Sequence, residues 1–192
     1  MMNPRPFHRP TLMALAAATL MAGRTSVPSS TQSATRTGIP YVDAVIEAGL
    51  SGDPRVLNAL IVLSTLPCTT REGLGGPPKC LQGEADGTLV QALPVLGSEG
   101  GHVRIDEINS WEGIGAARLD AVYRTGSYTY SDDFYPAGEF AVVFIPEGSA
   151  GALTLQVTPG GIVRFDHAFG PTIEELHQDH ASDFILGPFP TP

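Results

Sequence analysis

The chain of 192 residues has little cysteine, little tryptophan and few basic side chains. Two cysteines cannot supply the four ligands of a structural zinc site. With 11 basic against 20 acidic side chains, the formal charge of −9 disfavours nucleic acid and anionic membrane surfaces as partners. The 22 glycines and 17 prolines stay below the share of roughly 25–30 % that is typical of low-complexity chains. The apolar fraction of 42 % is enough to fill the core of one compact domain.

The basic and acidic residues are separated along the chain. Arg5 and Arg9 precede an uncharged apolar run at 11–22, and no acidic residue occurs before Asp43. This run is shorter than the roughly 20 apolar residues that span a bilayer, and it has the length of a signal-peptide core. We therefore expect a signal peptide at 1–23 and no membrane span in the mature chain. The protein is expected to be secreted, to the periplasm or the extracellular space.

The rest of the chain divides into a linker and a domain. Residues 24–38 are rich in serine and threonine and predict a flexible linker. Residues 39–192 predict a single globular domain, which holds seven basic and all 20 acidic side chains, a formal charge of −13. This charge makes a cation or a basic protein a more natural partner than nucleic acid.

Cys68 and Cys80 are the two cysteines, and they enclose a loop of turn-forming residues. In an exported chain such a pair favours one intramolecular disulfide, which stabilises a domain by about 3 kcal/mol through closure of the loop. A redox pair would have C-x-x-C spacing. The loop does not meet the requirements of a phosphate-binding loop, because Pro77 and Pro78 lack amide donors and no glycine precedes Lys79.

The spacing of apolar residues changes from helical to alternating along the domain. Residues 40–64 predict two consecutive helices, with Asp53 and Pro54 at the start of the second. Beyond the cysteines, about five strands are predicted within the segments 88–96, 117–125, 140–145, 153–158 and 162–165. The apolar segment 140–145 predicts a central strand covered on both faces, whereas the alternation at 153–158 predicts one wet face. Helices followed by strands predict an α+β fold with a mainly antiparallel sheet.

Two segments resemble known proteins. The segment Tyr41–Ile61, YVDAVIEAGLSGDPRVLNALI, resembles the opening of the nuclear-transport-factor-type roll that ketosteroid-isomerase-like proteins share. The resemblance implies that two N-terminal helices pack on a curved, mainly antiparallel sheet of about five strands, around an apolar pocket with an acidic or histidine base. The sequence GGPPKC ending at Cys80, with GSEGG at 97–101, looks like uncharacterised secreted bacterial proteins.

Two candidate catalytic residues lie in the middle of the chain. His102 follows Ser98 in a glycine-rich turn, which predicts either a nucleophile and base or a solvated hairpin. The nucleophile elbow G-x-S-x-G is absent there, because Leu96 stands in place of its first glycine. Asp120 stands in a strand where the base of a cone-shaped pocket would lie, but it alternates onto the face of Arg118, which favours a surface ion pair.

Further candidates lie towards the C-terminus. Asp166 and His167 are the other two candidate catalytic residues. His177 and His180 would share one side of a helix, and Asp179 would add an oxygen ligand, so these three are the candidate metal ligands. A polar C-terminal tail accounts for the same residues without a metal, and we expect no cofactor.

An aromatic and acidic segment at 128–135 is a candidate binding loop. Its tyrosines, together with Asp132 and Asp133, suit a cationic or sugar ligand, or Ca²⁺. A packed hairpin with a polar tip is the simpler interpretation. Trp111, the one tryptophan, is assigned to the core.

None of these motifs identifies a reaction. We expect an exported, non-enzymatic binding or interaction domain whose partner is a small molecule, a cation or a basic protein. One alternative is a small-molecule hydrolase, isomerase or dehydratase with an acid–base pair in a cone-shaped pocket. Another is a structural protein associated with the cell envelope. The enzymatic alternative requires Asp120 or His102 inside an apolar cavity.

Overall fold

The fold is described from a computed structural model, which covers residues 36–97, 99–108, 110, 115, 117–127, 129–148, 151–168 and 183–189. All of them belong to the compact unit Thr35–Pro192. The segment expected to be a signal peptide, 1–23, and most of the expected linker lie outside the described residues. Within the described part of the chain, no helix is both long enough and apolar enough to cross a membrane.

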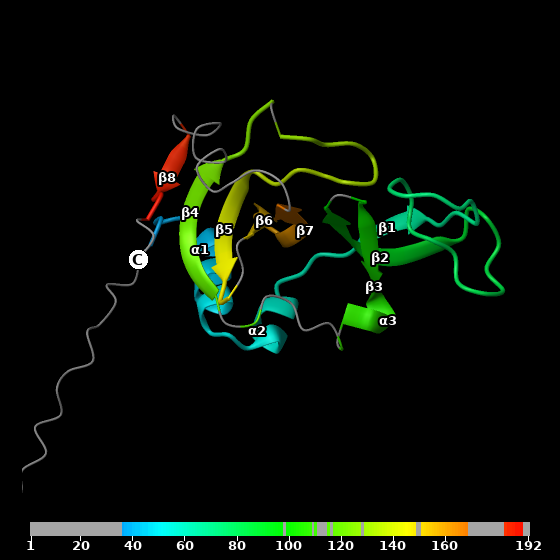
Figure 1. Ribbon diagram of the computed structural model, residues 1–192, viewed down its shortest axis with the longest axis horizontal. Helices are drawn as coiled ribbons and strands as arrows, with labels where there is room; N and C mark the ends of the chain where they lie inside the picture. Colours follow the sequence, from blue (N-terminus) through cyan, green and yellow to red (C-terminus); the bar gives the residue numbers. More distant parts are fainter. Residues whose placement is uncertain are drawn as a thin grey trace, which may run out of the picture. The chain divides into compact units, whose positions relative to one another are not determined.

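Two short helices open the described chain, α1 at Pro40–Leu50 and α2 at Pro54–Asn58 (Figure 1). Each begins with a proline, whose fixed φ suits the first helical turn. The Asp53 carboxylate caps α2 by accepting a hydrogen bond from the Arg55 backbone N–H at 3.0 Å. A single further turn, α3 at Ile105–Ile108, follows later in the chain.

The described residues form one sheet of eight strands. In chain order these are β1 (Ser64–Pro67), β2 (Leu89–Leu96), β3 (Gly101–Arg104), β4 (Ala117–Arg124), β5 (Phe140–Pro146), β6 (Ala152–Thr158), β7 (Gly161–Ala168) and β8 (Phe184–Leu186). Their order in the sheet is β1-β2-β7-β6-β5-β4-β8, and β3 pairs with β2 beside this path. The sheet is mixed, because β2 and β7 run parallel while the other pairs are antiparallel.

The predicted fold class is therefore wrong. In place of two helices packed on a mainly antiparallel sheet of about five strands, the described chain is mostly sheet, with eight strands in a mixed arrangement and three short helices. The strands that the sequence did not reveal, β1, β3 and β8, have only three or four residues, too few for the alternation of side chains to become recognisable. The parallel pairing of β2 with β7 joins segments far apart in the chain.

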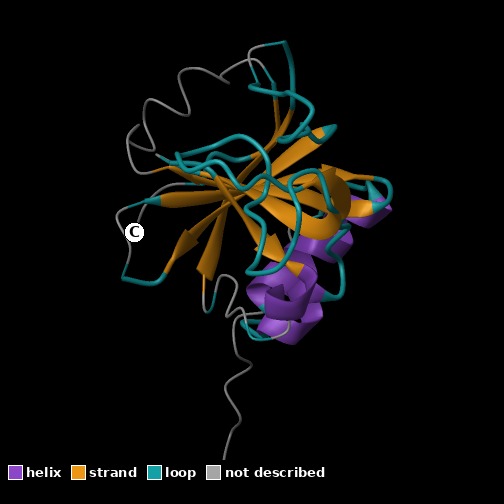
Figure 2. Cartoon of the chain, turned by 90° about the vertical axis from the view of Figure 1, so that its right-hand side faces the viewer, coloured by secondary structure: helices purple, strands orange, loops and turns teal. Residues whose placement is uncertain are grey.

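The sheet buries side chains on both faces. Strand β5 alternates between two clusters, with Phe140, Val142 and Phe144 in the larger and Ala141 and Val143 in the smaller. The prediction of a central strand covered on both faces at 140–145 is thereby confirmed for 140–144. The larger cluster also includes the apolar side of α1, and the helices gather at one side of the strands (Figure 2).

The other face of the sheet is covered as well, which corrects the expectation for 153–158. Thr154 and Gln156 of β6 were expected to face water, yet both are buried. Neighbouring β7 contributes the buried Arg164 to the same face, because Gln156 and Arg164 are paired across the two strands. Such polar side chains are buried only where hydrogen-bonding partners replace water, so this face needs a polar cover.

Gly49 of α1 packs directly against the sheet. A Cβ atom at this position would lie 2.3 Å from Cζ of Phe144. That ring is itself completely buried, so it has no open space into which to move. Glycine is normally unfavourable in a helix, and here the packing requires it.

We predict that Gly49→Ala destabilises the domain by about 1–3 kcal/mol, the usual effect of overpacking a core. Helix propensity alone would give the opposite sign, a gain of up to about 1 kcal/mol. The measurement is the midpoint of urea unfolding, with Ala44→Ser at an exposed position of the same helix as control. A Gly49→Ala variant as stable as the parent would show that helix and sheet are not in this contact.

Candidate functional site

Arg164 is the largest polar side chain in the interior, with 1 % of its surface exposed. Its Nε and Nη2 atoms donate to the two carboxylate oxygens of Asp166 at 2.6 and 3.0 Å. Its Nη1 donates to the backbone carbonyls of Tyr130 and Tyr135, both at 2.8 Å. The buried charge is thus paired and hydrogen-bonded, as a guanidinium in a low-dielectric interior must be.

Gln156 completes this polar cluster. Its side-chain nitrogen donates to Asp166 at 2.8 Å, and its side-chain oxygen accepts from the backbone N–H of Gly138 at 3.0 Å. Gly138 lies so close to β6 that a Cβ there would be 2.3 Å from the Val157 nitrogen. Together, Arg164 and Gln156 fix the segment 129–138 over the polar face of the sheet, and this segment is the cover that the face requires.

The segment 129–138 is held in shape by Asp132. One carboxylate oxygen accepts from the backbone N–H groups of Phe134 and Tyr135, each at 2.8 Å. The other accepts from the Tyr130 hydroxyl at 2.6 Å. The hydrogen bond from Tyr130 and those two backbone N–H groups hold the pKa of the Asp132 carboxyl below its usual value. These contacts agree with the simpler of the two interpretations of this segment, a packed hairpin with a polar tip.

His102 of β3 lies against this segment. Its Nε2 is 3.3 Å from the carbonyl oxygen of Phe134, and its ring centroid is 5.1 Å from that of Tyr135. Burial lowers the pKa of His102, because the charged imidazolium loses its hydration. The neutral ring then donates from Nε2 to the carbonyl, which leaves Nδ1 as an acceptor.

Tyr135 packs between His102 and the glycine-rich turn that precedes β3. The residue is 3 % exposed, and its hydroxyl makes no hydrogen bond to any described residue. A Cβ atom at Gly100, whose φ is +62°, would lie 2.8 Å from this hydroxyl and 3.3 Å from Cα of Gly75. Burial also raises the pKa of Tyr135, so its hydroxyl remains protonated.

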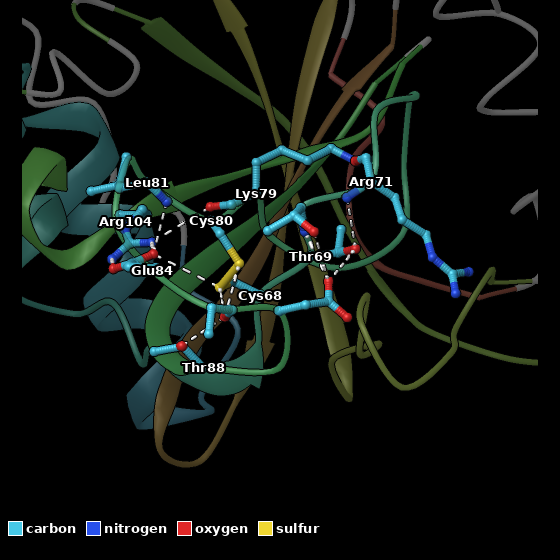
Figure 3. Close-up of a disulfide and its surroundings, with 12 residues drawn as sticks. Cys68, Thr69, Arg71, Lys79, Cys80, Leu81, Glu84, Thr88 and Arg104 are labelled. Atoms are coloured by element: carbon cyan, nitrogen blue, oxygen red, sulfur yellow. Dashed lines mark hydrogen bonds and ion pairs between the residues drawn. A yellow bond between two sulfur atoms is a disulfide. The ribbon is translucent and has the colours of Figure 1, made fainter.

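Cys68 and Cys80 form a disulfide, as the sequence predicts (Figure 3). Glu84 lies beside it and accepts two hydrogen bonds from Arg104, at 2.8 and 2.9 Å, and a third from the Leu81 backbone N–H. The hydrogen bonds from Arg104 hold the pKa of Glu84 below its usual value. The disulfide and this ion pair tie the loop 68–80 to β3.

The loop also pairs with the chain next to β1. The Thr69 backbone N–H donates to the Pro78 carbonyl at 2.8 Å, and the Cys80 N–H donates to the Thr69 carbonyl at 3.0 Å. Pro67 ends β1 immediately before this point and has no N–H to offer. The returning half of the loop thus lies along the border of the sheet.

A groove of about 360 Å³ lies between the disulfide loop and β3. Glycines, apolar side chains and a few polar groups line it, namely Gly73, Leu74, Gly75, Pro77, Pro78, Lys79, Leu81, Gly100, Gly101, His102, Arg104 and Glu107. A volume of this size is within the range of roughly 300–1,000 Å³ that is usual for small-molecule sites. We call this feature the loop groove.

The structure brings some of the predicted site residues together and separates others. His102 and the segment 129–135 contact one another, and Asp166 joins them through Arg164. His167 of β7 is half-buried, and burial lowers its pKa, but it does not line the loop groove. Asp166 forms an ion pair with Arg164, and a catalytic role for Asp166 stays a prediction.

Asp120 of β4 is not in the exposed ion pair that its alternation predicted. Its carboxylate does lie 3.3 Å from Nη1 of Arg118, but the residue is completely buried. The chain shifts register between Leu119 and Ala121, so the simple alternation breaks at this residue. Asp120 is also absent from the lining of the loop groove.

The remaining candidates lie outside the described residues, namely Ser98, Trp111, Tyr128, His177, Asp179 and His180. Among the described residues, the one group of side chains spaced to bind a metal is Cys68, Cys80 and Glu84. Because the two sulfur atoms are joined in the disulfide, they are not thiolates and do not fit a metal in this state.

Sequence reasoning missed Arg164, which organises the site. Its signal is the sequence Arg164-Phe165-Asp166, which puts a cation and a carboxylate on one face of a strand. The adjacent strand adds Gln156 to that face through the short turn at 159–160. A polar triplet of this kind on an otherwise apolar hairpin indicates a buried ion pair with a polar cover.

No protein-family model, curated protein or solved structure matched this chain. The resemblance of Tyr41–Ile61 to nuclear-transport-factor-type rolls stays a prediction.

We predict that Arg164→Met destabilises the domain by about 3–5 kcal/mol, because it leaves Asp166 without its cation and two carbonyls without donors. The matched control is Arg36→Met, which removes an ion pair whose two side chains are 63 % and 62 % exposed. The Arg36→Met variant should lose less than about 1 kcal/mol of its free energy of unfolding. Chemical denaturation compares the two variants, and equal losses would contradict the role given to Arg164.

We also predict that His102 makes stability depend on pH. Its pKa in the folded state lies below that of the unfolded chain, so the unfolded state binds the proton first. Neutral His102 makes its full contribution to the free energy of unfolding at a pH above the ordinary histidine pKa. This contribution is lost as the pH falls through the lower pKa of the folded state. Unfolding curves at several pH values should show a smaller loss on acidification for His102→Gln than for the parent. An unchanged slope would contradict the prediction.

Proposed function

We propose that this chain is an exported, non-enzymatic binding domain that holds a small molecule in the loop groove. The observation that carries the proposal is the groove itself, about 360 Å³ with apolar and polar groups side by side in its lining. The disulfide supports the proposed export, because such bonds persist in oxidising compartments.

The contacts around the groove favour binding over catalysis. The charged side chains that β3 and α3 contribute to the groove are both engaged, since Arg104 is held by Glu84 and the Glu107 carboxylate accepts from the Arg104 backbone N–H at 3.2 Å. Acid–base catalysis needs a second group placed opposite His102. Asp120, the other base that the sequence suggested, does not line the groove.

One observation favours catalysis as a second candidate function. His102 lines the groove as a neutral imidazole whose Nδ1 is left as an acceptor, the state that a general base requires. In this alternative, a small-molecule hydrolase or isomerase would use His102 as base. His102→Gln would then abolish turnover while leaving ligand affinity nearly unchanged, whereas a pure binding domain shows no turnover to abolish.

We predict that Gly101→Phe blocks the groove without unfolding the protein. A Cβ atom added at Gly101 would meet no atom within 4 Å, and the residue does not adopt a positive φ, so the backbone accepts a side chain here. Because Gly101 lines the groove, we expect the ring to extend into it. Gly160→Ser is the control, a glycine in a turn outside the groove with ordinary contacts. Both variants should unfold at nearly the parent's temperature.

The binding measurement uses a panel of small sugars, amines and carboxylates on the full oxidised chain, with the backbone resonances of Gly100 and His102 as reporters. At least one class should shift these resonances in the parent and in Gly160→Ser, and not in Gly101→Phe. If no class shifts them, or if Gly101→Phe responds like the parent, the loop groove is not a binding site.

A further inference from the structure

The basic residues of this acidic chain are unevenly paired. Five arginines each lie within 4 Å of a carboxylate, namely Arg36, Arg55, Arg104, Arg118 and Arg164. Arg71 and Lys79, both in the disulfide loop, form no ion pair with any described residue. The Lys79 ammonium instead donates to the Arg71 carbonyl at 3.2 Å, and its side chain extends along the loop towards Arg71 (Figure 3).

Lys79 is the cation of the loop groove that remains available to a ligand. Arg104, the other cation of its lining, has two of its guanidinium nitrogens bound to Glu84. A second groove of about 360 Å³ contacts both Lys79 and Arg71, but Glu72 and Asp86 also line it and offset their charge. The loop groove contains one carboxylate, that of Glu107.

The backbone of the loop adds donors to this charge. The N–H groups of residues 72–76 donate to no acceptor among the described residues. Gly73, Gly75 and Gly76 have φ of +125°, +68° and +67°, whereas Leu74 between them does not adopt a positive φ. Residues of alternating backbone hand occur in backbone concavities that bind anions, so these φ values are compatible with such a site.

The buried hydroxyl of Tyr135 is a further polar group next to the loop groove. The hydroxyl of Tyr135 is buried, protonated and without a partner, and it lies directly behind Gly100 and close to Gly75, two glycines of the groove lining. A buried hydroxyl without a partner is unfavourable by about 1–3 kcal/mol, so such groups are commonly satisfied by a ligand or water. Tyr135 does not itself line the loop groove, so this donor lies behind the Gly100 turn that borders it.

The composition of the groove selects among anions. The carboxylate of Glu107 repels any anion in the groove, but it repels a phosphate dianion more strongly than a singly charged carboxylate, and a dianion would need more than one available cation. A carboxylate needs one cation and a few N–H or O–H donors. Leu74, which is 73 % exposed, lies with Pro77 and Leu81 beside the donors and offers an apolar contact to the rest of the ligand.

We propose that the loop groove binds the carboxylate of a small organic acid with an apolar body. Lys79 supplies the charge, the N–H groups of Gly73, Leu74 and Gly75 supply hydrogen bonds, and the apolar body lies against Leu74 and Leu81. This proposal rests on the proposed function, since it names the class of ligand for the same site. The free C-terminus of a short peptide presents the same chemistry and is an arm of the test.

The experiment uses the fact that Lys79 is the one lysine of the sequence. Reductive methylation with ¹³C-formaldehyde labels this side chain and the terminal amine of the full oxidised chain, and the Lys79 methyl signal then reports binding. The probes are isovalerate, isovaleramide and isoamylamine, which share an apolar body and differ in charge. Gly-Leu and its amide form the peptide arm.

Isovalerate should shift the Lys79 signal and bind at least about tenfold more tightly than the amide or the amine, the effect of one charge-assisted hydrogen bond.

Unlabelled variants are compared by calorimetry. Lys79→Met should remove the preference for the acid, Lys79→Arg should retain part of it, and the control Arg36→Met should leave it unchanged. If Gly-Leu binds and isovalerate does not, the ligand is a peptide terminus and the small-acid proposal is wrong.

The two proposals fail in different ways. If amide and amine bind as tightly as isovalerate, and Gly101→Phe blocks all three, the groove is a binding site but not one for carboxylates. If Lys79→Met keeps the preference for isovalerate, the assignment of the charge to Lys79 is wrong. If Gly101→Phe changes the binding of no probe, both the proposed function and the carboxylate proposal are overturned.

Discussion

The guanidinium of Arg164 is the constraint on which the arrangement of the site depends. It stands on β7 in the interior, so its charge has to be met by the carboxylate of Asp166 and by backbone carbonyls of the segment 129–138. That requirement brings the segment down onto the sheet and places Tyr135 beside His102. The loop groove then lies in front of Tyr135, on the other side of the Gly100 turn. A buried ion pair thus defines the position of a surface site with which it has no direct contact.

Local chemistry was predictable from the sequence and long-range pairing was not. Cys68 and Cys80 identified their own bond, because the chain has no other cysteine and its N-terminus resembles an export signal. The apolar segment 140–145 likewise identified a strand with two covered faces. The parallel pairing of β2 with β7 left no local trace, and neither did the burial of Asp120 at a register shift. A pattern of period two describes a strand's faces, but what covers each face is decided by distant segments.

In the candidate site, too, the residue types were predictable from the sequence and the contacts between distant segments were not. His102 and the segment 128–135 were each suggested by residue types, but their contact depends on how two loops cross. The formal charge of −13 over 39–192 favours cationic partners for the domain as a whole. The loop groove instead favours an anion. The acidic side chains nearby are already engaged with Arg104, whereas Lys79 is left without a carboxylate. Net charge describes long-range attraction, whereas affinity depends on the groups that remain unneutralised at the point of contact.

The position of the disulfide loop along β1 has a further consequence for association between molecules. An open border of a sheet offers its backbone to any extended chain, and proteins avoid unwanted pairing there with proline or with covering segments. Here Pro67 offers no N–H at the end of β1, and Pro78–Cys80 occupy the backbone of Thr69 just beyond it, within the loop that the disulfide closes. Reduction of Cys68 and Cys80 would therefore affect more than stability. We expect it to loosen the pairing at Thr69 and so to make this end of the border easier for a neighbouring molecule to reach.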